Sequence, residues 1–509
     1  MAVRRWLLHP FLFGFYFVLT LAASNTSELK GWPDLVWPIL ISLVACSLLW
    51  VVGFATTRDT QKAAVLCLLW FVAFSVYGYV AETLRVSGTL RVIGREGGLG
   101  VLFGLALFGP SLAIGRSARR LDPVNRYMSL VALLLLGYTT VQLYLGLRRD
   151  RDPRASLPLP AVLPDQAPTG ERPDIYLIIL DKYTGGEVLE RHFGFDNSEF
   201  EGFLRSRGFV VPRSSQANYS LTQLALASML NLDYLQSLPR ERSLYDLIED
   251  NRLAAFLKLQ GYRFAFFPTG YRITFQNRNA DVQLPAPREV RGEFAAVWQN
   301  TTMLPELLRG ACALIGCEAG RFLLTAQAAD IMDWKFERMK DLSGGDRPTF
   351  ALAHLSLPHE PYLYHADCSH RDLYWPLGAG LLGDEEADRG YLDQIRCANR
   401  KVAALVDSIL VRSTRPAVIL LQADHGHGRL GELPAFEKLN AYQLRERMSV
   451  FSAYLLPGVP SGAIVDSVTP VNAVRLVLRH YFGADLSPLE DASYWAAKDR
   501  PLDMVRVKY

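Results

Sequence analysis

The sequence has little net charge and few cysteines for its length. Its 54 Lys and Arg residues nearly balance 51 Asp and Glu residues, which leaves a net charge of +3 over 509 residues. We find no basic stripe interleaved with aromatic residues, so the composition argues against a nucleic-acid partner. The six cysteines contain no CxxC pair, so their spacing does not support a zinc knuckle. We also find no internal repeat.

Long apolar runs, by contrast, fill the first third of the chain. Crossing a bilayer takes roughly 20 residues of helix, and five runs are long and apolar enough. Five such runs in succession, joined by short polar loops, do not suit a soluble protein, so we expect a five-helix transmembrane domain over residues 1–147. The first run lacks a good small-residue cleavage site, which favours a retained helix over a signal peptide. The runs are about Trp6–Ser24, Leu35–Ala55, Lys62–Val80, Leu99–Ile114 and Tyr127–Leu147.

Basic residues mark alternate ends of these runs. Arg4 and Arg5 precede the first run, and others lie between the second and third and between the fourth and fifth. Short loops rich in Lys and Arg stay in the cytoplasm. An odd number of spans then predicts that the chain after Leu147 is extracytoplasmic, on the periplasmic side of a bacterial inner membrane. The loop Arg85–Arg95 and the run Arg148–Arg154 oppose this rule.

The remainder of the chain divides into a tether and a soluble domain. Residues 148–172 are rich in proline and charge, which is typical of an extended linker. The domain expected over residues 173–509 holds four of the six cysteines, and an extracytoplasmic location lets disulfides persist. The simplest pairing is Cys312 with Cys317 and Cys368 with Cys397.

Strand-like and helix-like segments alternate in this domain. Ile175–Leu180, Phe350–Leu355 and Ala417–Leu421 are continuous apolar runs, typical of strands buried on both faces of a parallel sheet. This alternation predicts an α/β domain with a mainly parallel central sheet, whose ligands gather at the carboxyl ends of the strands. A further strand is expected at Tyr262–Phe267. Helices are expected at about Gly186–Arg205, Leu221–Leu230, Leu244–Leu259 and Glu385–Val411.

Polar side chains stand at or just beyond the ends of the three apolar strands. A single Asp in such a place is usually a turn residue or a helix cap, and a single His is often a core or surface residue. Their joint occurrence favours a site for a divalent metal, which binds carboxylates and imidazoles. The residues are Asp181, Lys182, His354, His359, Asp424, His425 and His427.

Thr222 lies in the first turn of the helix expected in SLTQLALASMLN, with Ser220 as the expected N-cap. Its hydroxyl can be a second capping group. Beside a divalent metal it can instead be an activated nucleophile, where the helix amides would favour an anion. The residues alone leave both roles open.

The order of these motifs resembles the alkaline phosphatase and sulfatase superfamily. With five preceding membrane helices, the chain is more similar to the lipoteichoic acid synthases and phosphoethanolamine transferases. The resemblance implies that Thr222 is the nucleophile and that His359 contacts the substrate phosphate. It also implies one divalent metal, zinc or manganese, bound by Asp181, Thr222, Asp424 and His425. We expect further substrate contacts from His354, His427 and Lys182.

Three departures from the family patterns narrow the chemistry. The transferases usually carry Glu where this chain has Asp181. The TQLAL segment has neither the Pro nor the Arg of the sulfatase motif, so cleavage of sulfate esters is disfavoured. No Asp lies around His354–Pro361 to hold a second metal, which favours a single ion.

The resemblance therefore implies a membrane phospho-group transferase. Such an enzyme moves a phospholipid headgroup, of phosphoglycerol or phosphoethanolamine type, through phosphothreonine to a glycan or lipid acceptor of the cell envelope. A membrane-tethered phosphodiesterase or phosphatase is one alternative, and a non-catalytic envelope-assembly scaffold is another. The aromatic segment Tyr362–Trp375 fits either a membrane interface, as a lipid donor requires, or the domain core.

Overall fold

The computed structural model describes most of the chain, and its contacts divide the chain into two compact units. The first unit comprises Met1–Pro153, Gly270–Arg272 and Arg291–Leu324, and the second comprises Arg154–Thr269, Ile273–Val290 and Thr325–Tyr509. The described residues are 7–25, 29, 33–86, 98–118, 120–149, 158–161, 172–238, 243–269, 271–284, 293–316, 326–342, 345–371, 384–428, 433–497 and 500–507.

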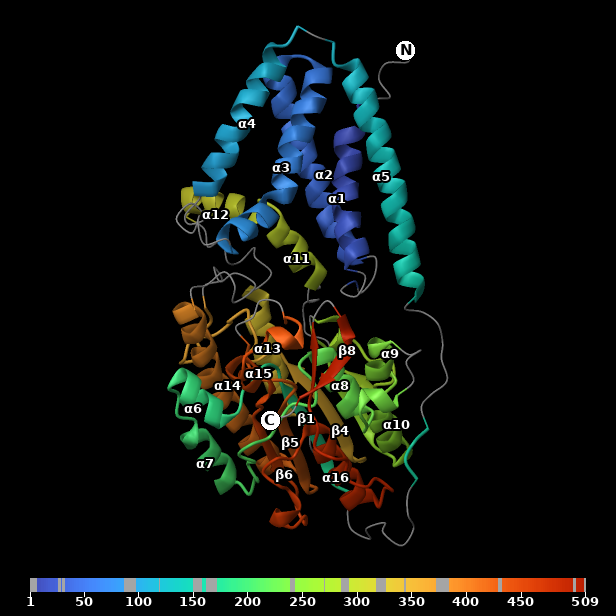
Figure 1. The fold of residues 1–509 in the computed structure, drawn as a ribbon, viewed down its shortest axis with the longest axis vertical. Coiled ribbons are helices and arrows are strands. Elements are labelled where there is room, and N and C mark those ends of the chain that lie inside the picture. The colour runs from blue at the N-terminus through green and yellow to red at the C-terminus, as the bar shows by residue number, and fades with distance from the viewer. Residues whose placement is uncertain are drawn as a thin grey trace. The chain divides into compact units, whose positions relative to one another are not determined.

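Five apolar helices, α1 to α5, make up most of the first unit (Figure 1). Four of them are long and apolar enough to cross a membrane, and α1 is a shorter apolar helix. Many large apolar side chains on α2, α4 and α5 are exposed, as expected of helices whose solvent is lipid. The expected set of five apolar helices is confirmed. They are α1 His9–Ser24, α2 Pro33–Thr57, α3 Thr60–Val86, α4 Gly98–Arg116 and α5 Asp122–Arg149.

Two helices from later in the chain also belong to the first unit. Phe294 and Trp298 of α11 are buried in one apolar cluster with Leu21, Leu35 and Leu143 of the membrane helices. Residues expected in the extracytoplasmic domain thus pack among the apolar helices. The two helices are α11 Glu293–Thr301 and α12 Leu304–Ile315.

A six-stranded sheet forms the centre of the second unit. Its order is β3-β2-β4-β1-β5-β6, and all neighbours are parallel except the pair β5 and β6. Strands β1, β4 and β5 are buried along their whole length, in agreement with their unbroken apolar sequences. The predicted mainly parallel α/β sheet is confirmed. The strands are β1 Asp174–Leu180, β2 Arg263–Phe267, β3 Val282–Gln283, β4 Thr349–Leu355, β5 Ala417–Ala423 and β6 Ser452–Leu455.

The register of the sheet brings its polar strand ends side by side. Leu180, at the end of β1, pairs with Leu355 of β4 and with Ala423 of β5. Asp181 and Asp424 are therefore at the same level, one residue beyond their strands. Because parallel strands end at one edge of a sheet, residues far apart in sequence meet there.

Helices flank this sheet, and two that we expected to be continuous are interrupted. Gly194 ends α6 in the left-handed conformation with φ of 60°, a common helix stop. The Asn251 side chain accepts from the Ala254 amide and so starts a new helix, α10. The helices are α6 Gly186–Phe193, α7 Ser198–Ser206, α8 Thr222–Leu230, α9 Leu244–Glu249, α10 Arg252–Leu259, α13 Ala326–Met339, α14 Asp384–Arg412, α15 Ala441–Met448 and α16 Pro470–Phe482. Two further strands, β7 Tyr494–Ala497 and β8 Arg500–Arg506, form a separate antiparallel pair.

The segment after β4 tests two smaller expectations. Cys368 and Cys397 form the expected disulfide, with a Cα–Cα distance of 5.0 Å. Tyr362 and Tyr364 are buried, so these two aromatic residues pack in the domain core rather than facing a membrane. Residues 372–383 and Cys317 lie outside the described residues, so the pairing of Cys317 stays a prediction.

Candidate metal centre and active site

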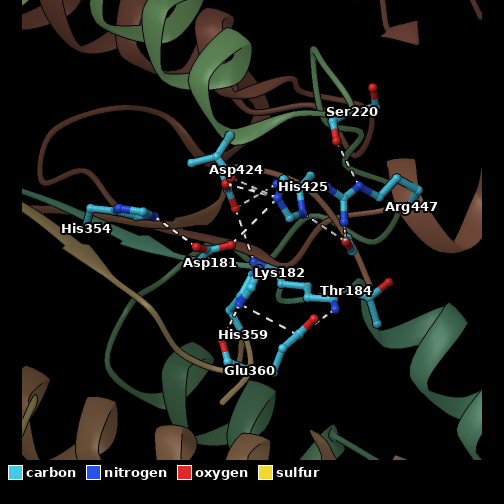
Figure 2. Close-up of polar contacts among 12 residues, drawn as sticks. Asp181, Lys182, Thr184, Ser220, His354, His359, Glu360, Asp424, His425 and Arg447 are labelled. Carbon is cyan, nitrogen blue, oxygen red and sulfur yellow. Dashed lines mark hydrogen bonds and ion pairs between the residues drawn. The ribbon is translucent and has the colours of Figure 1, made fainter. Parts of the chain in front are cut away.

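Asp181 follows β1 directly, and its side chain is buried. Its backbone N–H donates to the carbonyl of Leu355 at 3.0 Å, and its carbonyl accepts from the amide of His359 at 3.1 Å. The next residue, Lys182, has a left-handed backbone with φ of 68°. That conformation is uncommon for a residue with a side chain and concentrates at functional sites. The turn brings the Asp181 carboxylate close to Asp424 (Figure 2).

The loop after β5 carries the second half of the site. Oδ1 of Asp424 accepts from the amides of His425 at 2.9 Å and Lys182 at 3.2 Å, so both loops fix this carboxylate. The amide of Gly426 donates to the carbonyl of Arg447 at 2.7 Å. A Cβ atom at Gly426 would collide with neighbouring carbonyl oxygens. Glycine is therefore the residue that lets the two backbones approach here.

Asp181, His354 and Asp424 form a buried group whose facing ligand atoms all lie within 4.8 Å of one another. Within the described part of the chain, Oδ1 of Asp181 and Oδ2 of Asp424 are buried and have no hydrogen-bond partner. Buried carboxylate oxygens without partners are costly, and a divalent cation would compensate for both. Two carboxylates with an imidazole suit zinc or manganese. These residues therefore fit the metal implied by the sequence.

His425 extends this group. Its Nε2 lies 3.4 Å from Oδ2 of Asp424 and 3.7 Å from Oδ1 of Asp181. Its Nδ1 lies 3.0 Å from the carbonyl oxygen of Gly426. Because a carbonyl only accepts, Nδ1 carries the proton and Nε2 presents a lone pair, as a metal ligand must. The structure also adds His354, which we expected at the substrate, to this potential ligand group.

Thr222 is the first residue of α8, and its side chain lies beside the same group of potential metal ligands. Its Oγ1 lies 3.0 Å from Nε2 of His425, and the hydroxyl donates because that nitrogen carries no proton. The expectation that Ser220 caps the helix is wrong, because the N-cap is Leu221. The Ser220 hydroxyl instead donates to Ala496 of β7 at 3.0 Å. Thr222 and the other three expected ligands thus meet in one place.

The two buried carboxylates have opposite pKa shifts. Burial and the negative charge of Asp181 raise the pKa of Asp424 to about 6. Burial opposes ionisation of Asp181 as well, but the neighbouring histidines, His359 foremost, hold its pKa below the usual range. Carboxylates that share a site do not ionise equally easily. A cation between them would favour the charged form of both.

Burial and the positive charge of Arg447 hold the pKa of His425 well below its usual value. The imidazole is therefore neutral near pH 7. A neutral ring with Nδ1 protonated can use Nε2 for coordination.

The buried Lys182 forms an ion pair with the half-buried Glu360 beside the group, with Nζ and Oε2 2.6 Å apart. Burial opposes ionisation of Glu360, but His359 and Lys182 hold its pKa well below the usual value. The Lys182 ammonium group, which we expected at the substrate, thus pairs with Glu360. The Lys182 side chain is 3% exposed. His359, at 37% exposure, is the open member of the four site histidines. The substrate contacts of Lys182 and His359 stay predictions.

His427 is enclosed in the protein interior. Its Nδ1 lies 2.5 Å from a carboxylate oxygen of Glu446, and its ring packs against Tyr391 and Phe193. Burial lowers the pKa of His427 to about 4, although Glu446 acts in the other direction. In this conformation the ring holds α15 against the loop after β5. Its expected contact with substrate stays a prediction.

Arg447 is a site residue that the sequence analysis missed. Its Nε donates to the carbonyl of Ser220 at 2.8 Å, and its Nη1 donates to that of Gly426 at 3.5 Å (Figure 2). One buried guanidinium therefore joins the segment before Thr222 to the loop that carries His425. Burial lowers the pKa of Arg447, while the nearby carboxylates of the group act in the other direction. The sequence signal is faint, because Arg447 lies in an ordinary charged helix.

No family model and no curated protein matches the chain. Solved structures do match it. The periplasmic domain of the phosphoethanolamine transferase EptC from Escherichia coli, in complex with zinc, is 13% identical over 69% of this chain and 96% of its own, with a TM-score of 0.44. The corresponding domain of EptC from Campylobacter jejuni is 10% identical over 62% and 91%, with a TM-score of 0.41.

One match extends over the membrane helices. The integral membrane protein lipooligosaccharide phosphoethanolamine transferase A from Neisseria meningitidis is 12% identical over 94% of this chain and 95% of its own, with a TM-score of 0.41. The chain thus has structural matches among the phosphoethanolamine transferases. The motifs of the sequence resemble the same group of enzymes.

Proposed function

We propose that this chain is a metal-dependent phosphotransferase on the periplasmic face of a bacterial inner membrane. It takes a phosphoethanolamine or phosphoglycerol headgroup from a phospholipid and passes it to an envelope glycan or lipid. The position of the Thr222 hydroxyl carries the proposal. It lies 3.0 Å from Nε2 of His425, at the start of a helix and beside two buried carboxylates.

Thr222 is the nucleophile in this scheme. Its Oγ1 attacks the phosphorus of the donor, the new P–O bond forms, and the bond to the diacylglycerol oxygen breaks. The hydroxyl loses its proton and the diacylglycerol oxygen gains one, which leaves phosphothreonine. An acceptor hydroxyl then attacks the same phosphorus, its proton is released, and Thr222 recovers a proton as its P–O bond breaks.

Neighbouring groups stabilise the charge that moves in these steps. Asp181, Thr222, Asp424 and His425 would hold zinc or manganese, with His354 beside them. A bound cation stabilises charge on the phosphoryl oxygens and favours the ionised threonine. The uncapped amides at the start of α8 favour the same anion. His359, the exposed histidine of the site, contacts the phosphate.

Full-length protein in vesicles that contain labelled phosphatidylethanolamine or phosphatidylglycerol tests this proposal. Wild type should release diacylglycerol and give a headgroup–phosphate adduct on the Thr222 peptide by mass spectrometry. Thr222→Ala should abolish both, and Thr222→Ser should retain part because it keeps a hydroxyl. Ser198→Ala is the matched control, since Ser198 is also the first residue of a helix and is exposed.

The acceptor separates transfer from hydrolysis. With an envelope glycan or lipid present, the label should move from diacyl lipid to that acceptor. Label that appears only as free headgroup phosphate would identify a hydrolase and overturn the transfer step. Diacylglycerol release by Thr222→Ala would overturn the nucleophile.

A further inference from the structure

Helix α12 presents a cluster of large apolar side chains at the protein surface. Leu307 is 52% exposed, Leu314 is 89% exposed and Ile315 is 76% exposed. Three such residues within nine positions of one helix are unlike the scattered exposed apolar residues of an ordinary soluble surface.

The exposed residues lie on one face of the helix. At 100° per residue, Leu307, Leu314 and Ile315 fall within one arc, and the positions of Glu306 and Arg309 fall outside it. Cys312 borders this arc and is buried. The helix is thus amphipathic, with part of its apolar face packed and part left open.

Contacts within the first unit fix the place of α12 along the membrane helices. The amide of Met303, directly before α12, donates to the carbonyl of Phe74 in α3 at 2.9 Å. The apolar run of α3 ends at Ala81, before the charged Glu82 and Arg85, so Phe74 lies about 10 Å from the end of that run at 1.5 Å per residue. Met303 also packs against the cluster of Tyr77, Ala81 and Leu99.

The neighbouring helix α11 lies at the same end of the helices. Phe294 and Trp298 pack against the end of α1 at Leu21 and the start of α2 at Leu35. Figure 1 shows α12 lying across the ends of α3 and α4 rather than alongside them. An amphipathic helix at this depth, with an open apolar face, has the character of an interfacial membrane helix.

We propose that α12 lies in the outer headgroup layer of the bilayer and inserts Leu307, Leu314 and Ile315 among the lipids. The open face belongs to a unit that holds four helices long and apolar enough to cross a membrane, and the start of α12 packs near the end of the apolar run of α3. A segment from the second half of the chain is therefore a membrane-binding element. This inference rests on the packing of the first unit and not on the chemistry of the site.

Fluorescent labels on single introduced cysteines in the full chain test this proposal. The variants Leu307→Cys, Leu314→Cys and Ile315→Cys are labelled without reductant, since the free native cysteines Cys46 and Cys67 are buried. The protein is reconstituted in phosphatidylethanolamine–phosphatidylglycerol vesicles, with or without lipids that carry a quencher near the headgroup.

Matched controls are Leu259→Cys and Val411→Cys, at 75% and 85% exposure. Both lie at the ends of helices that lead into the start of β2 and β5, opposite the strand ends that carry the site. Labels at 314 and 315 should be quenched at least about threefold more than these controls, because an interfacial face sits roughly 5–10 Å into the lipid. Equal quenching would overturn the proposal. A label that is shielded from water yet not quenched by lipid would indicate a protein partner and would also overturn it.

Discussion

A single buried guanidinium holds the two loops of the site together, and this gives a sharp mutational contrast. Arg447→Lys keeps the charge but cannot bond two carbonyls with one planar group. We expect kcat to fall about tenfold or more, roughly 1.4 kcal/mol in the activation barrier, with a smaller change in KM. The thermal unfolding midpoint should stay near that of wild type.

The exposed Arg445 lies on the same helix. Arg445→Lys is therefore the control and should leave kcat unchanged. If Arg447→Lys turns over at the wild-type rate, the guanidinium does not position Thr222.

Metal content gives a second test at the scale of single residues. Purified full-length protein should bind about one zinc or manganese ion per chain, since four ligands from one set of side chains complete a single site. Asp424→Asn keeps the shape of the side chain but removes the negative oxygen that faces the group, so bound metal should be lost. Asp407→Asn, a change at an exposed carboxylate on α14, should not alter metal content. Elemental analysis that finds equal metal in both variants contradicts the assigned ligands.

Residues with a local sequence signature were predictable, and residues defined by long-range packing were not. Asp181, Asp424 and His425 follow buried apolar strands, so the fold class alone places them together. Arg447 lies in the same short helix as Arg445, and nothing in the local sequence distinguishes the two. Only the packing of α15 against the loop after β5 makes Arg447, and not Arg445, a residue of the site.

At the scale of elements, the loop after β5 depends on close backbone approach. The Cβ atom in Gly426→Ala would collide with the carbonyl oxygens of Glu446 and Ser449. We expect a loss of about 1–3 kcal/mol in stability, as for other overpacked sites, and a matching loss of metal affinity as His425 shifts. Gly462→Ala is the control because open space surrounds that position. Thermal unfolding that is identical in the two variants would show that the loop relaxes freely.

Strands were easier to predict than helix boundaries. β1, β4 and β5 are buried on both faces, so their sequences are unbroken apolar runs. The breaks at Gly194 and Asn251 depend on single capping residues inside segments that otherwise have a helical pattern. The sequence analysis did not predict the strands β7 and β8. Apolar and polar residues alternate little in β8, and most of that strand is exposed.

At the scale of the whole molecule, the basic loops of the first unit lie together. Nζ of Lys62, at the start of α3, donates to the carbonyl of Gly115, near the end of α4, at 2.9 Å. Both loops should be cytoplasmic by their charge, so the α/β unit should be outside. Protease added to intact spheroplasts should remove that unit, and inverted vesicles should protect it. The opposite pattern would reverse the orientation.

The sequence predicted both the apolar helices and the α/β domain. It did not predict that α12, from the part of the chain expected in the α/β domain, packs with the apolar helices. Five apolar runs and an alternating α/β pattern are strong periodic signals. Helix α12 has 12 residues, which is too short to suggest a membrane span by length. Its apolar face is typical of any helix on a soluble core. Packing against the membrane helices is what reveals its place.

The burial of Phe294 and Trp298 against α1 and α2 also has a consequence for biogenesis. When α5 leaves the ribosome, every apolar run has been synthesised, yet the side chains that complete this cluster have not. They arrive only after the first strands of the α/β unit have been translated. Completion of this cluster therefore waits for synthesis of the chain through Trp298. A nascent protein that stops before residue 294 lacks both aromatic side chains, so its apolar cluster is incomplete.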